Sequence, residues 1–162
     1  PILINRCGVL TGPSQMGKVD QGVVVLWMAK HFFGGKLSYI GFEGKGLQVR
    51  DMLHVEDLAD LIEMQLHRPE HFSGETFNVG GGVELSSSLL ELTEWCEKIT
   101  GQSISIQSDP ESRPGDIPWF ITDSRRIQNH SGWKPKRNLE SIFEEIHHWI
   151  HSNQDQLRSI IS

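Results

Sequence analysis

Short strand-like segments alternate with helical segments along this chain, and this alternation restricts the fold more than any other feature of the sequence. Apolar patterns and turn residues predict extended segments at 2–10, 37–40, 50–55, 76–79 and 103–107. The helical period and its capping residues predict helices at 21–33, 56–68, 88–100, 123–129 and 138–150. The alternation predicts an α/β fold.

Several of these helices have recognisable first residues. Asp20 is suited to cap the segment 21–33, which is apolar nearly all round and is therefore expected to pack between other elements. Ser88 followed by Glu91 has the spacing of a capping box. Asn138 is suited to cap the last helix. These signals predict where the helices begin.

The chain shows no internal repeat and no linker-like composition. We therefore expect one domain over residues 1–150, followed by a polar, frayed tail over residues 151–162. The longest apolar run, Val23 to Ala29, is far shorter than the ~20 residues that cross a bilayer, so no membrane span is predicted. The chain opens on Pro1 without a Met or a basic-then-apolar leader, and we expect it to begin partway through a longer protein.

Charge and cysteine content exclude several function classes. The formal net charge is −6 and the Lys and Arg residues are scattered, which argues against a general nucleic-acid binder. Any anionic ligand must then be held by a few local arginines. Cys7 and Cys96 lie far apart and form no CxxC pair, so neither a zinc cage nor a disulfide framework is predicted. A reducing cytoplasm is the expected location.

Three motifs allow both a functional and a structural interpretation. Gly80–Gly82 follow a predicted strand, so their amides could cradle a phosphate or simply form a tight turn. His147 and His151, with His148 between them, could bind a metal or only provide polar surface, and we predict no metal site. His54 lies beside several acids, but no nucleophile motif accompanies it, which favours an acid-rich helix N-terminus over a catalytic triad.

Two arginines suggest a site for an anion. Arg50 ends a strand-turn segment ahead of a helix, and Arg113 lies in a loop constrained by Pro and Gly, three residues before Asp116. This arrangement suits a clamp on a diphosphate, with the carboxylate accepting sugar hydroxyls. A pair of surface salt bridges is the alternative, and the composition favours neither.

An ordered series of sequence blocks extends over residues 2–150. The blocks are NRCGVLTGP, VDQGVVV, LSYIG, QVRDMLHVEDLADLI, GETFNVGGG, RPGD, TDSRRI and GWKP. The series resembles the C-terminal half of the extended short-chain dehydrogenase/reductase family, which comprises NAD-dependent nucleotide-sugar epimerases and dehydratases. The DQG block is most similar to the CDP-paratose (tyvelose) 2-epimerase branch. The resemblance implies the C-terminal part of an extended NAD(P)-binding Rossmann-like fold, with the last sheet strands and a small mixed substrate-binding subdomain.

The resemblance also implies roles for the charged residues. Arg50 and Arg113 match arginines that bind the diphosphate of the ligand, and Asp116 matches the carboxylate that meets the ribose. Asp51 matches a neighbour that helps to fix the turn entering the helix. These residues are the predicted substrate-binding centre.

Further contacts are implied at other positions of the same blocks. Ser38 and Tyr39 match neighbours of the base, and Gln21 lies near the position where the family touches the sugar-nucleotide. Cys7 and Gly8 fall where the family's strand passes the nicotinamide ring of NAD, and here the chain departs from the usual Arg-Tyr-Phe-Asn. Cofactor contacts are therefore predicted at those two residues.

The catalytic elements of the family are missing from the sequence. The family holds NAD on an N-terminal GxxGxxG turn and removes a proton with a Tyr-x-x-x-Lys pair, whereas the chain's one tyrosine, Tyr39, is followed four positions later by Glu43. We therefore expect no catalytic residue here, NAD bound mainly by a missing N-terminal half, and no turnover by the isolated chain.

The predicted function is the substrate-binding portion of an NAD-dependent nucleotide-sugar epimerase, with a CDP-sugar 2-epimerase favoured. A 4-epimerase, a 4,6-dehydratase, and a non-catalytic nucleotide-sugar-binding or subunit-interaction module stay open. The expected partner is a nucleotide-sugar, with no nucleic acid and no membrane. Strands 2–10 and 76–79 are expected to pair with a parallel sheet from the absent portion, and their exposed edges favour a homodimer or strand exchange.

Overall fold

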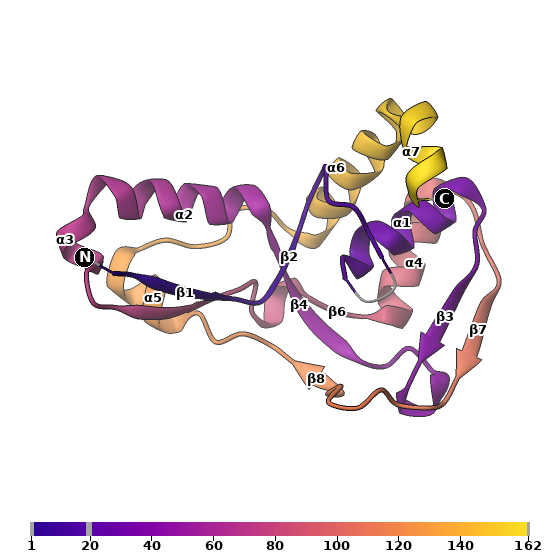
Figure 1. Ribbon diagram of the computed structural model, residues 1–162, viewed down its shortest axis with the longest axis horizontal. Helices are drawn as coiled ribbons and strands as arrows, with labels where there is room; N and C mark the ends of the chain where they lie inside the picture. The colour runs from indigo at the N-terminus through magenta and orange to yellow at the C-terminus, as the bar shows by residue number, and fades with distance from the viewer. Residues whose placement is uncertain (1, 19–20, 162) are drawn as a thin grey trace.

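The computed structural model describes residues 2–18 and 21–161, in which strands and helices alternate as the sequence predicts (Figure 1). The strands are β1 (Ile4–Cys7), β2 (Val9–Thr11), β3 (Leu37–Ile40), β4 (Val49–His54), β5 (Thr76–Val79), β6 (Ser86–Ser88), β7 (Ile106–Asp109) and β8 (Trp119–Phe120). The helices are α1 (Val23–Phe33), α2 (Val55–His67), α3 (Pro69–Phe72), α4 (Leu89–Thr100), α5 (Arg125–Ser131), α6 (Leu139–Ser152) and α7 (Gln154–Ile161), with short 3-10 turns η1 (Phe42–Gly44) and η2 (Val83–Leu85). The α/β fold is confirmed.

The segment 2–10, predicted as one largely buried strand, is two strands with different partners. β1 pairs in parallel with β5, from Ile4 opposite Thr76, whereas β2 pairs in parallel with β4, from Val9 opposite Met52. The break falls at Gly8, where an added Cβ would lie 2.6 Å from the hydroxyl of Thr122, so the chain passes too close to that residue for a side chain. β1 is also mostly exposed, because in the described chain β5 is its one strand neighbour.

Strand β4 joins the two ends of the molecule. Its second half pairs with β2, and its first half pairs antiparallel with β6 and in parallel with β8. Successive side chains of a strand point to opposite faces, so Met52 enters one hydrophobic core and Leu53 enters the other. We call these the helical core and the sheet core.

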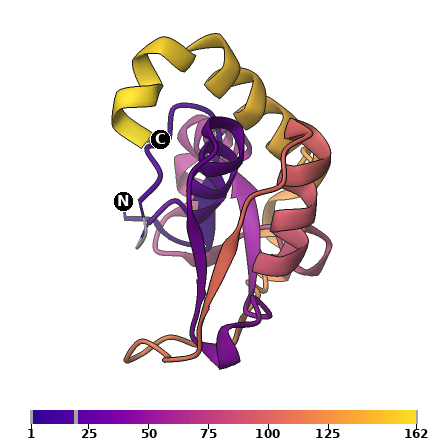
Figure 2. The same ribbon diagram turned by 90° about the vertical axis from the view of Figure 1, so that its right-hand side faces the viewer.

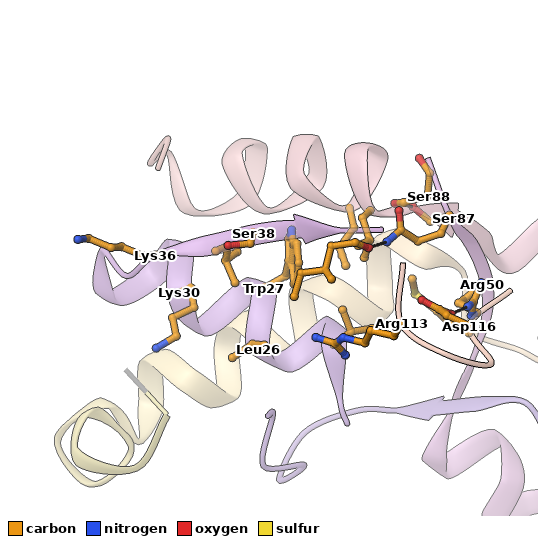
Figure 3. A pocket seen from close by; sticks show the side chains of 17 residues that line it. Leu26, Trp27, Lys30, Lys36, Ser38, Arg50, Ser87, Ser88, Arg113 and Asp116 are labelled. Carbon is orange, nitrogen blue, oxygen red and sulfur yellow. Dashed lines mark hydrogen bonds and ion pairs between the residues drawn. The ribbon is translucent and has the colours of Figure 1, made fainter. Parts of the chain in front are cut away.

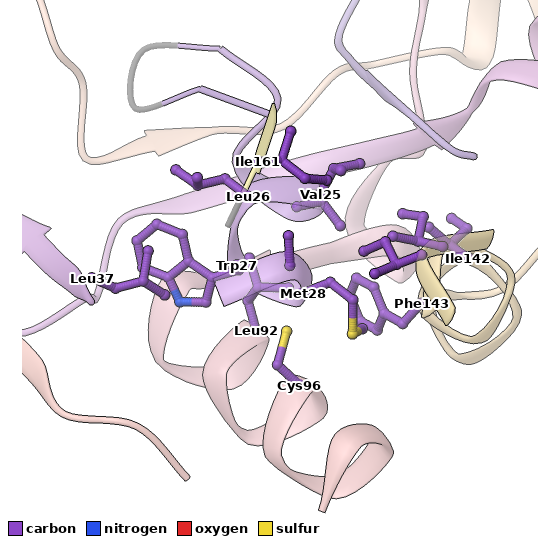
Figure 4. Packing of buried hydrophobic residues seen from close by; sticks show 14 of the residues in the cluster. Val25, Leu26, Trp27, Met28, Leu37, Leu92, Cys96, Ile142, Phe143 and Ile161 are labelled. Atoms are coloured by element: carbon purple, nitrogen blue, oxygen red, sulfur yellow. The ribbon is translucent and has the colours of Figure 1, made fainter. Parts of the chain in front are cut away.

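The helical core contains α1, which packs between other elements as predicted (Figure 4). Helices α4, α6 and α7 and strand β3 surround it. The buried members of the helical core are Val24, Val25, Leu26, Trp27, Met28, Ala29, Leu37, Met52, Leu92, Cys96, Ile142, Phe143, Ile146, Ile150, Leu157 and Ile161. None of the helices in the described residues is long and apolar enough to cross a membrane.

The sheet core lies at the opposite end of the molecule (Figure 1). Its members come from β4, β5, α2, α3, α5 and the segment after α5. They are Leu53, Leu61, Phe72, Phe77, Val79, Ile127 and Trp133. The sheet core therefore lies between strands β4 and β5 and the helices α2, α3 and α5.

The cap predictions are largely confirmed. Ser88 and Glu91 form the capping box of α4, and the Asn138 side chain accepts a hydrogen bond from a backbone amide in the first turn of α6. Asp20 lies outside the described residues, and α1 instead follows Gly22, whose φ of 74° is left-handed.

Three boundaries differ from prediction. The strand expected at 103–107 is at Ile106–Asp109, where it follows the length of β3, and the helix expected at 123–129 is Arg125–Ser131. The frayed tail predicted for residues 151–162 is wrong over the described residues 151–161, because α6 extends to Ser152 and α7 follows it. Leu157 and Ile161 lie one helical turn apart and are both buried in the helical core, which holds α7 in place.

Candidate functional site

A cavity of about 310 Å³ lies on the surface of the helical core (Figure 3). Its walls come from α1, β3, β4, the start of α4 and the loop between β7 and β8. The lining residues are Val23, Leu26, Trp27, Lys30, Lys36, Leu37, Ser38, Ile40, Gln48, Arg50, Met52, Ser87, Ser88, Leu89, Leu92, Arg113 and Asp116. The volume is at the lower end of the range of ligand pockets.

The floor of the cavity is apolar and rigid. The Trp27 indole N–H donates to the hydroxyl of Thr93 at 3.0 Å, and its ring stacks with Tyr39 at a centroid distance of 6.3 Å. The Tyr39 hydroxyl also lies 2.7 Å from the Thr93 hydroxyl. Because these contacts fix the indole, the cavity offers a preformed flat apolar surface.

The rim of the cavity is cationic. Lys30 and Lys36 lie at one end, Arg113 lies between the ends, and Arg50 lies at the other end beside Asp116 (Figure 3). Asp116 is the one carboxylate among the described lining residues. In a chain whose net charge is −6, this local excess of positive charge favours an anionic ligand.

Arg50 is held by acceptors inside the protein. Its Nη2 donates to the Asp116 carboxylate and to the Ile117 carbonyl, both at 2.8 Å, and its Nη1 donates to the Val49 carbonyl at 2.8 Å. The side chains of Arg50 and Asp116 are 24% and 28% exposed. Of the two alternatives left by the sequence, a diphosphate clamp and surface salt bridges, the salt bridge is present at Arg50, which also lines the cavity, and the diphosphate contact stays a prediction.

Arg113 differs from Arg50 in having a free guanidinium. No side chain or carbonyl of the described residues bonds to it, although the Asp116 amide closes a turn by donating to the Arg113 carbonyl at 3.1 Å. Figure 3 shows the Arg113 side chain extending toward Leu26 and Trp27 while Arg50 and Asp116 face each other. Arg113 is therefore placed to meet a ligand on the apolar floor.

The structure brings some predicted site residues together and separates others. Ser38, Arg50, Arg113 and Asp116 line one cavity. Tyr39 lies behind the floor with Trp27 and Thr93, and burial raises the pKa of its hydroxyl. Gln21, Tyr39, Cys7 and Gly8 are not among the lining residues. Their ligand contacts stay predictions.

Cys7 and Gly8 lie at the junction of β1 and β2 and are not among the residues that line the cavity. Cys7 is exposed, and partial burial raises the pKa of its thiol. The Gly8 amide donates to the Val79 carbonyl at 2.9 Å. Gly8 thus lies where the chain passes from its pairing with β5 to its pairing with β4.

Asp51 acts on a different turn from the one predicted. Its fully buried carboxylate accepts from the Gly82 amide at 3.0 Å and from the Thr122 hydroxyl at 3.1 Å. The turn that enters α2 is instead fixed by His54, whose Nδ1 accepts from the Glu56 amide at 3.1 Å. The helix N-terminus interpretation of His54 is confirmed.

The glycine turn is structural. The Gly80 amide donates to the Ser124 hydroxyl at 2.9 Å, and the Gly82 amide donates to Asp51, so these two amides are already bonded inside the protein. A Cβ at Gly81 would lie 2.0 Å from the Met52 carbonyl. The tight-turn interpretation is confirmed, and the phosphate-cradle interpretation is wrong.

The histidines of α6 pack against an aromatic ring. His147 and His151 lie edge-on to Phe32 at centroid distances of 5.6 and 6.0 Å. Burial is the main cause that lowers the pKa of His147, with smaller effects from its neighbours His151 and His148. Their observed contacts join α6 to α1.

Several lining residues were not among the predicted site residues, including Trp27, Lys30, Lys36 and Gln48. Trp27 and Lys30 belong to a helix that appeared apolar nearly all round, and its one internal lysine was the available signal. Lys36 immediately precedes a predicted strand, but nothing local shows that this strand end borders a cavity.

The chain is similar in sequence to proteins of one known family. Residues 1–146 match the family model described as GDP-mannose 4,6 dehydratase. The chain is 30% identical over 152 residues to the CDP-paratose 2-epimerase of Salmonella typhi, covering 93% of this chain and 45% of that protein. It is 36% identical over 148 residues to a probable GDP-L-fucose synthase of Oryza sativa subsp. japonica, covering 89% of this chain and 43% of that protein.

A solved structure has the same arrangement of elements. The dTDP-glucose 4,6-dehydratase of Bacillus anthracis, in complex with NAD, matches with a TM-score of 0.79 and 25% identity over 99% of this chain and 47% of that chain. The chain therefore spans about half the length of the relatives it matches.

Proposed function

The chain belongs to the GDP-mannose 4,6-dehydratase-like group of extended short-chain dehydrogenase/reductase epimerases and dehydratases, and from that premise we propose that its cavity binds a nucleoside diphosphate sugar. The observation that carries the proposal is the convergence of Arg50 and Arg113, 63 positions apart, on one cavity with an apolar floor. Guanidinium groups suit the oxygens of a diphosphate.

The rest of the cavity suits the other parts of such a ligand. The fixed Trp27 ring and its aliphatic neighbours offer a flat apolar surface to a base or a sugar ring, and Ser38 offers a hydroxyl that both donates and accepts. Lys30 and Lys36 add positive charge at the opposite end from Arg50. Apolar surface with a few placed polar groups is the usual composition of a nucleotide site.

The favoured member of the family is a CDP-sugar 2-epimerase, supported by the DQG block and the likeness to the Salmonella typhi enzyme. In that reaction bound NAD⁺ would accept a hydride from a hydroxyl-bearing sugar carbon while a base outside this chain takes the hydroxyl proton; return of both to the resulting carbonyl, with the hydride on the opposite face, would invert the configuration. A 4-epimerase or a 4,6-dehydratase would use the same binding residues. We assign to this chain the positioning of the nucleotide-sugar and the neutralisation of its charge.

The described residues do not fit a complete NAD site. The amides of Gly80 and Gly82 are bonded to Ser124 and Asp51, so this glycine turn cannot cradle the dinucleotide diphosphate. Contacts of Cys7 and Gly8 with a nicotinamide ring stay predictions. We therefore propose that the chain supplies the nucleotide-sugar half of an NAD-dependent site and no turnover of its own.

The test is calorimetric titration of the chain with CDP-, UDP-, dTDP- and GDP-sugars. We expect one nucleotide class to bind best, and Arg113→Ala to weaken it at least ~10-fold, because a charged hydrogen bond contributes about 1.5–3 kcal/mol. Arg125→Ala is the matched control, since Arg125 pairs with Asp123 on the surface and does not line the cavity.

Two results would contradict the proposal. One is that none of the four sugars binds the wild-type chain, and the other is that Arg113→Ala binds as tightly as Arg125→Ala. Turnover of any of the sugars by the pure chain with NAD would contradict the assignment of binding without catalysis.

A further inference from the structure

The Trp27 ring that lines the cavity is held from behind by the hydroxyl of Thr93 on α4. We propose that Thr93 is a positioning residue for the nucleotide-sugar: its hydroxyl fixes the Trp27 indole at the floor of the cavity, and Tyr39 acts through the same hydroxyl instead of touching the ligand. The inference rests on the proposed function. It adds to the site a residue that is not among those predicted from the sequence.

The hydrogen bonds of the Thr93 hydroxyl are the first argument. A hydroxyl has one proton to donate and two lone pairs with which to accept. The Thr93 hydroxyl donates to the Leu89 carbonyl, one helical turn earlier, at 2.8 Å and accepts from the Trp27 indole N–H at 3.0 Å. Burial raises the pKa of Tyr39, which keeps its proton and donates it to the remaining lone pair at 2.7 Å. The Thr93 hydroxyl is therefore fully used.

The second argument is that this hydroxyl joins three walls of the cavity. Trp27 belongs to α1, Tyr39 to β3 and Thr93 to α4. Each of these elements also lines the cavity, α1 with Trp27 itself, β3 with Ser38 and α4 with Leu89. Figure 4 shows the Trp27 ring beside α4. A change at this one hydroxyl therefore reaches the floor from behind, without altering a group that lines the cavity.

The third argument is burial. Trp27 and Thr93 are only 4% and 7% exposed, so water cannot readily replace a lost bond between them. In the part of the chain that the structure describes, the Thr93 hydroxyl is the one acceptor bonded to the indole N–H. A buried donor without an acceptor is unfavourable, so the indole would regain a partner through movement of its own ring or of the Tyr39 ring. Such movement would remove the flat surface that the cavity offers.

Two substitutions of Thr93 separate its hydroxyl from its packing. Thr93→Val keeps the branched shape and removes the hydroxyl, which leaves the Trp27 and Tyr39 donors without their acceptor. Thr93→Ser keeps the hydroxyl and removes the methyl group. Tyr39→Phe removes one donor and leaves the bond between Trp27 and Thr93 in place. A positioning role predicts the largest effect for Thr93→Val, a smaller effect for Tyr39→Phe and almost none for Thr93→Ser.

The first measurement follows the indole N–H protons of the ¹⁵N-labelled, ligand-free chain by NMR. Trp133 is the internal reference, because it is also 4% exposed and its indole N–H donates to the Asp57 carbonyl at 3.0 Å, but it does not line the cavity. Thr93→Val should speed solvent exchange of the Trp27 indole proton at least ~10-fold and leave that of Trp133 unchanged. Thr93→Ser should leave both rates within about twofold of wild type.

The second measurement is calorimetric titration with the preferred nucleotide-sugar. Thr93→Val should weaken binding at least ~5-fold, because a surface that is no longer fixed in advance must be ordered when the ligand binds. Thr93→Ser should restore binding to within about twofold of wild type, which a role in packing alone does not predict. Circular dichroism checks the fold of each variant. If Thr93→Val does not fold, Thr93→Ala takes its place, since it differs from Thr93→Ser by the hydroxyl oxygen alone.

Three results would overturn the proposal. The variant that lacks the hydroxyl could bind the sugar as tightly as Thr93→Ser, or Thr93→Ser could bind as weakly as the variant that lacks the hydroxyl. Tyr39→Phe could also weaken binding more than loss of the Thr93 hydroxyl does, which would mean that Tyr39 touches the ligand itself.

Failure of the proposed function gives a different result. In that case the wild-type chain binds none of the four sugars, and the role of Thr93 in binding fails with it. If instead the wild-type chain binds a sugar and the three variants bind it equally well, the proposed function stands and only the role of Thr93 is contradicted.

Discussion

The helical core and the sheet core differ in how completely they are enclosed. Helices α4, α6 and α7 pack around α1, and the view from that end shows them grouped beside the β3–β7 pair (Figure 2). At the sheet end, β1 has β5 as its one strand partner in the described chain, and large apolar side chains remain exposed, including Ile2 at 74% and Leu66 at 74%. Parallel strands are usually covered on both faces.

This difference bears on the candidate site. Its apolar lining includes Leu26, Trp27, Leu37 and Met52, all members of the helical core. Residues of the sheet core do not line the cavity in the described part of the chain. The geometry of the site should therefore depend on the enclosed core and only weakly on the open one, and this expectation can be tested.

The largest expected effect comes from removing one phenylalanine from each core. Phe143 in the helical core and Phe77 in the sheet core are both 0% exposed, and Phe→Ala in a core costs about 3–5 kcal/mol. We expect Phe143→Ala to loosen α1, α4 and α6 and to abolish nucleotide-sugar binding. Phe77→Ala should loosen β1, β5 and α5 and leave binding nearly unchanged. Hydrogen exchange by segment and calorimetry measure the two effects.

The comparison of the two cores would be wrong if Phe77→Ala speeds exchange in α1 and α4 as much as Phe143→Ala does. In that case the molecule unfolds as one cooperative unit, and the site depends on both cores. Leu90→Ala, at a position 40% exposed on α4, is a surface control in which exchange should change little.

The second effect concerns the link between the cores. Arg137 bonds to Asp57 of α2 at 2.9 Å and to Glu56, and its Nε lies 3.4 Å from the Glu145 carboxylate of α6. Asp57 is 0% exposed, so Arg137→Ala strands a buried carboxylate, which costs ~3 kcal/mol. We expect Arg137→Ala to lower the free energy of unfolding, as measured with urea. Amide hydrogen exchange in α2 and α6 should then no longer change together.

The neighbouring Lys136 provides the matched control for Arg137. Lys136 pairs with Asp60, but both side chains are substantially exposed, so Lys136→Ala should leave stability almost unchanged. If Arg137→Ala and Lys136→Ala lower the free energy of unfolding equally, burial of Asp57 does not strengthen its ion pair with Arg137, and the proposed link between α2 and α6 is contradicted.

The sequence predicted best the features that depend on neighbouring residues. The capping box of Ser88 and Glu91 and the left-handed Gly101 at the end of α4 are local signals, and both are present in the structure. The break at Gly8 was missed because its cause is Thr122, more than a hundred positions away. Packing of α7 was missed because two buried residues, Leu157 and Ile161, outweigh a polar composition.

The same limit applies to the site. The resemblance implied six substrate-binding residues. Four of them line the cavity, namely Ser38, Arg50, Arg113 and Asp116, whereas Gln21 and Tyr39 do not. The sequence pattern cannot show that Arg50 and Asp116, 66 positions apart, form an ion pair. Arg50 and Arg113 therefore appeared equivalent in the sequence. Their difference depends on three-dimensional contacts.

The smallest expected effect is a pH dependence at the junction of the two cores. His54 is 0% exposed, and burial lowers its pKa below the ordinary value of 6.5, although the nearby Glu145 carboxylate opposes this. Below pH 6.5 the unfolded chain then binds a proton that the folded chain does not, so stability falls as the pH drops through 6.5 toward the folded pKa. Above that window the contribution is constant. Urea unfolding at a series of pH values measures this slope.

The variant His54→Asn isolates this contribution, because asparagine can still accept the Glu56 amide as an N-cap but does not titrate in this range. Its slope between pH 7 and pH 5 should be shallower than that of wild type. The remaining slope includes His147, half-buried on α6, whose pKa burial lowers in the same direction. His147→Phe should remove that part and leave the His54 part. If His54→Asn keeps the full slope, protonation of His54 does not contribute to the loss of stability at low pH.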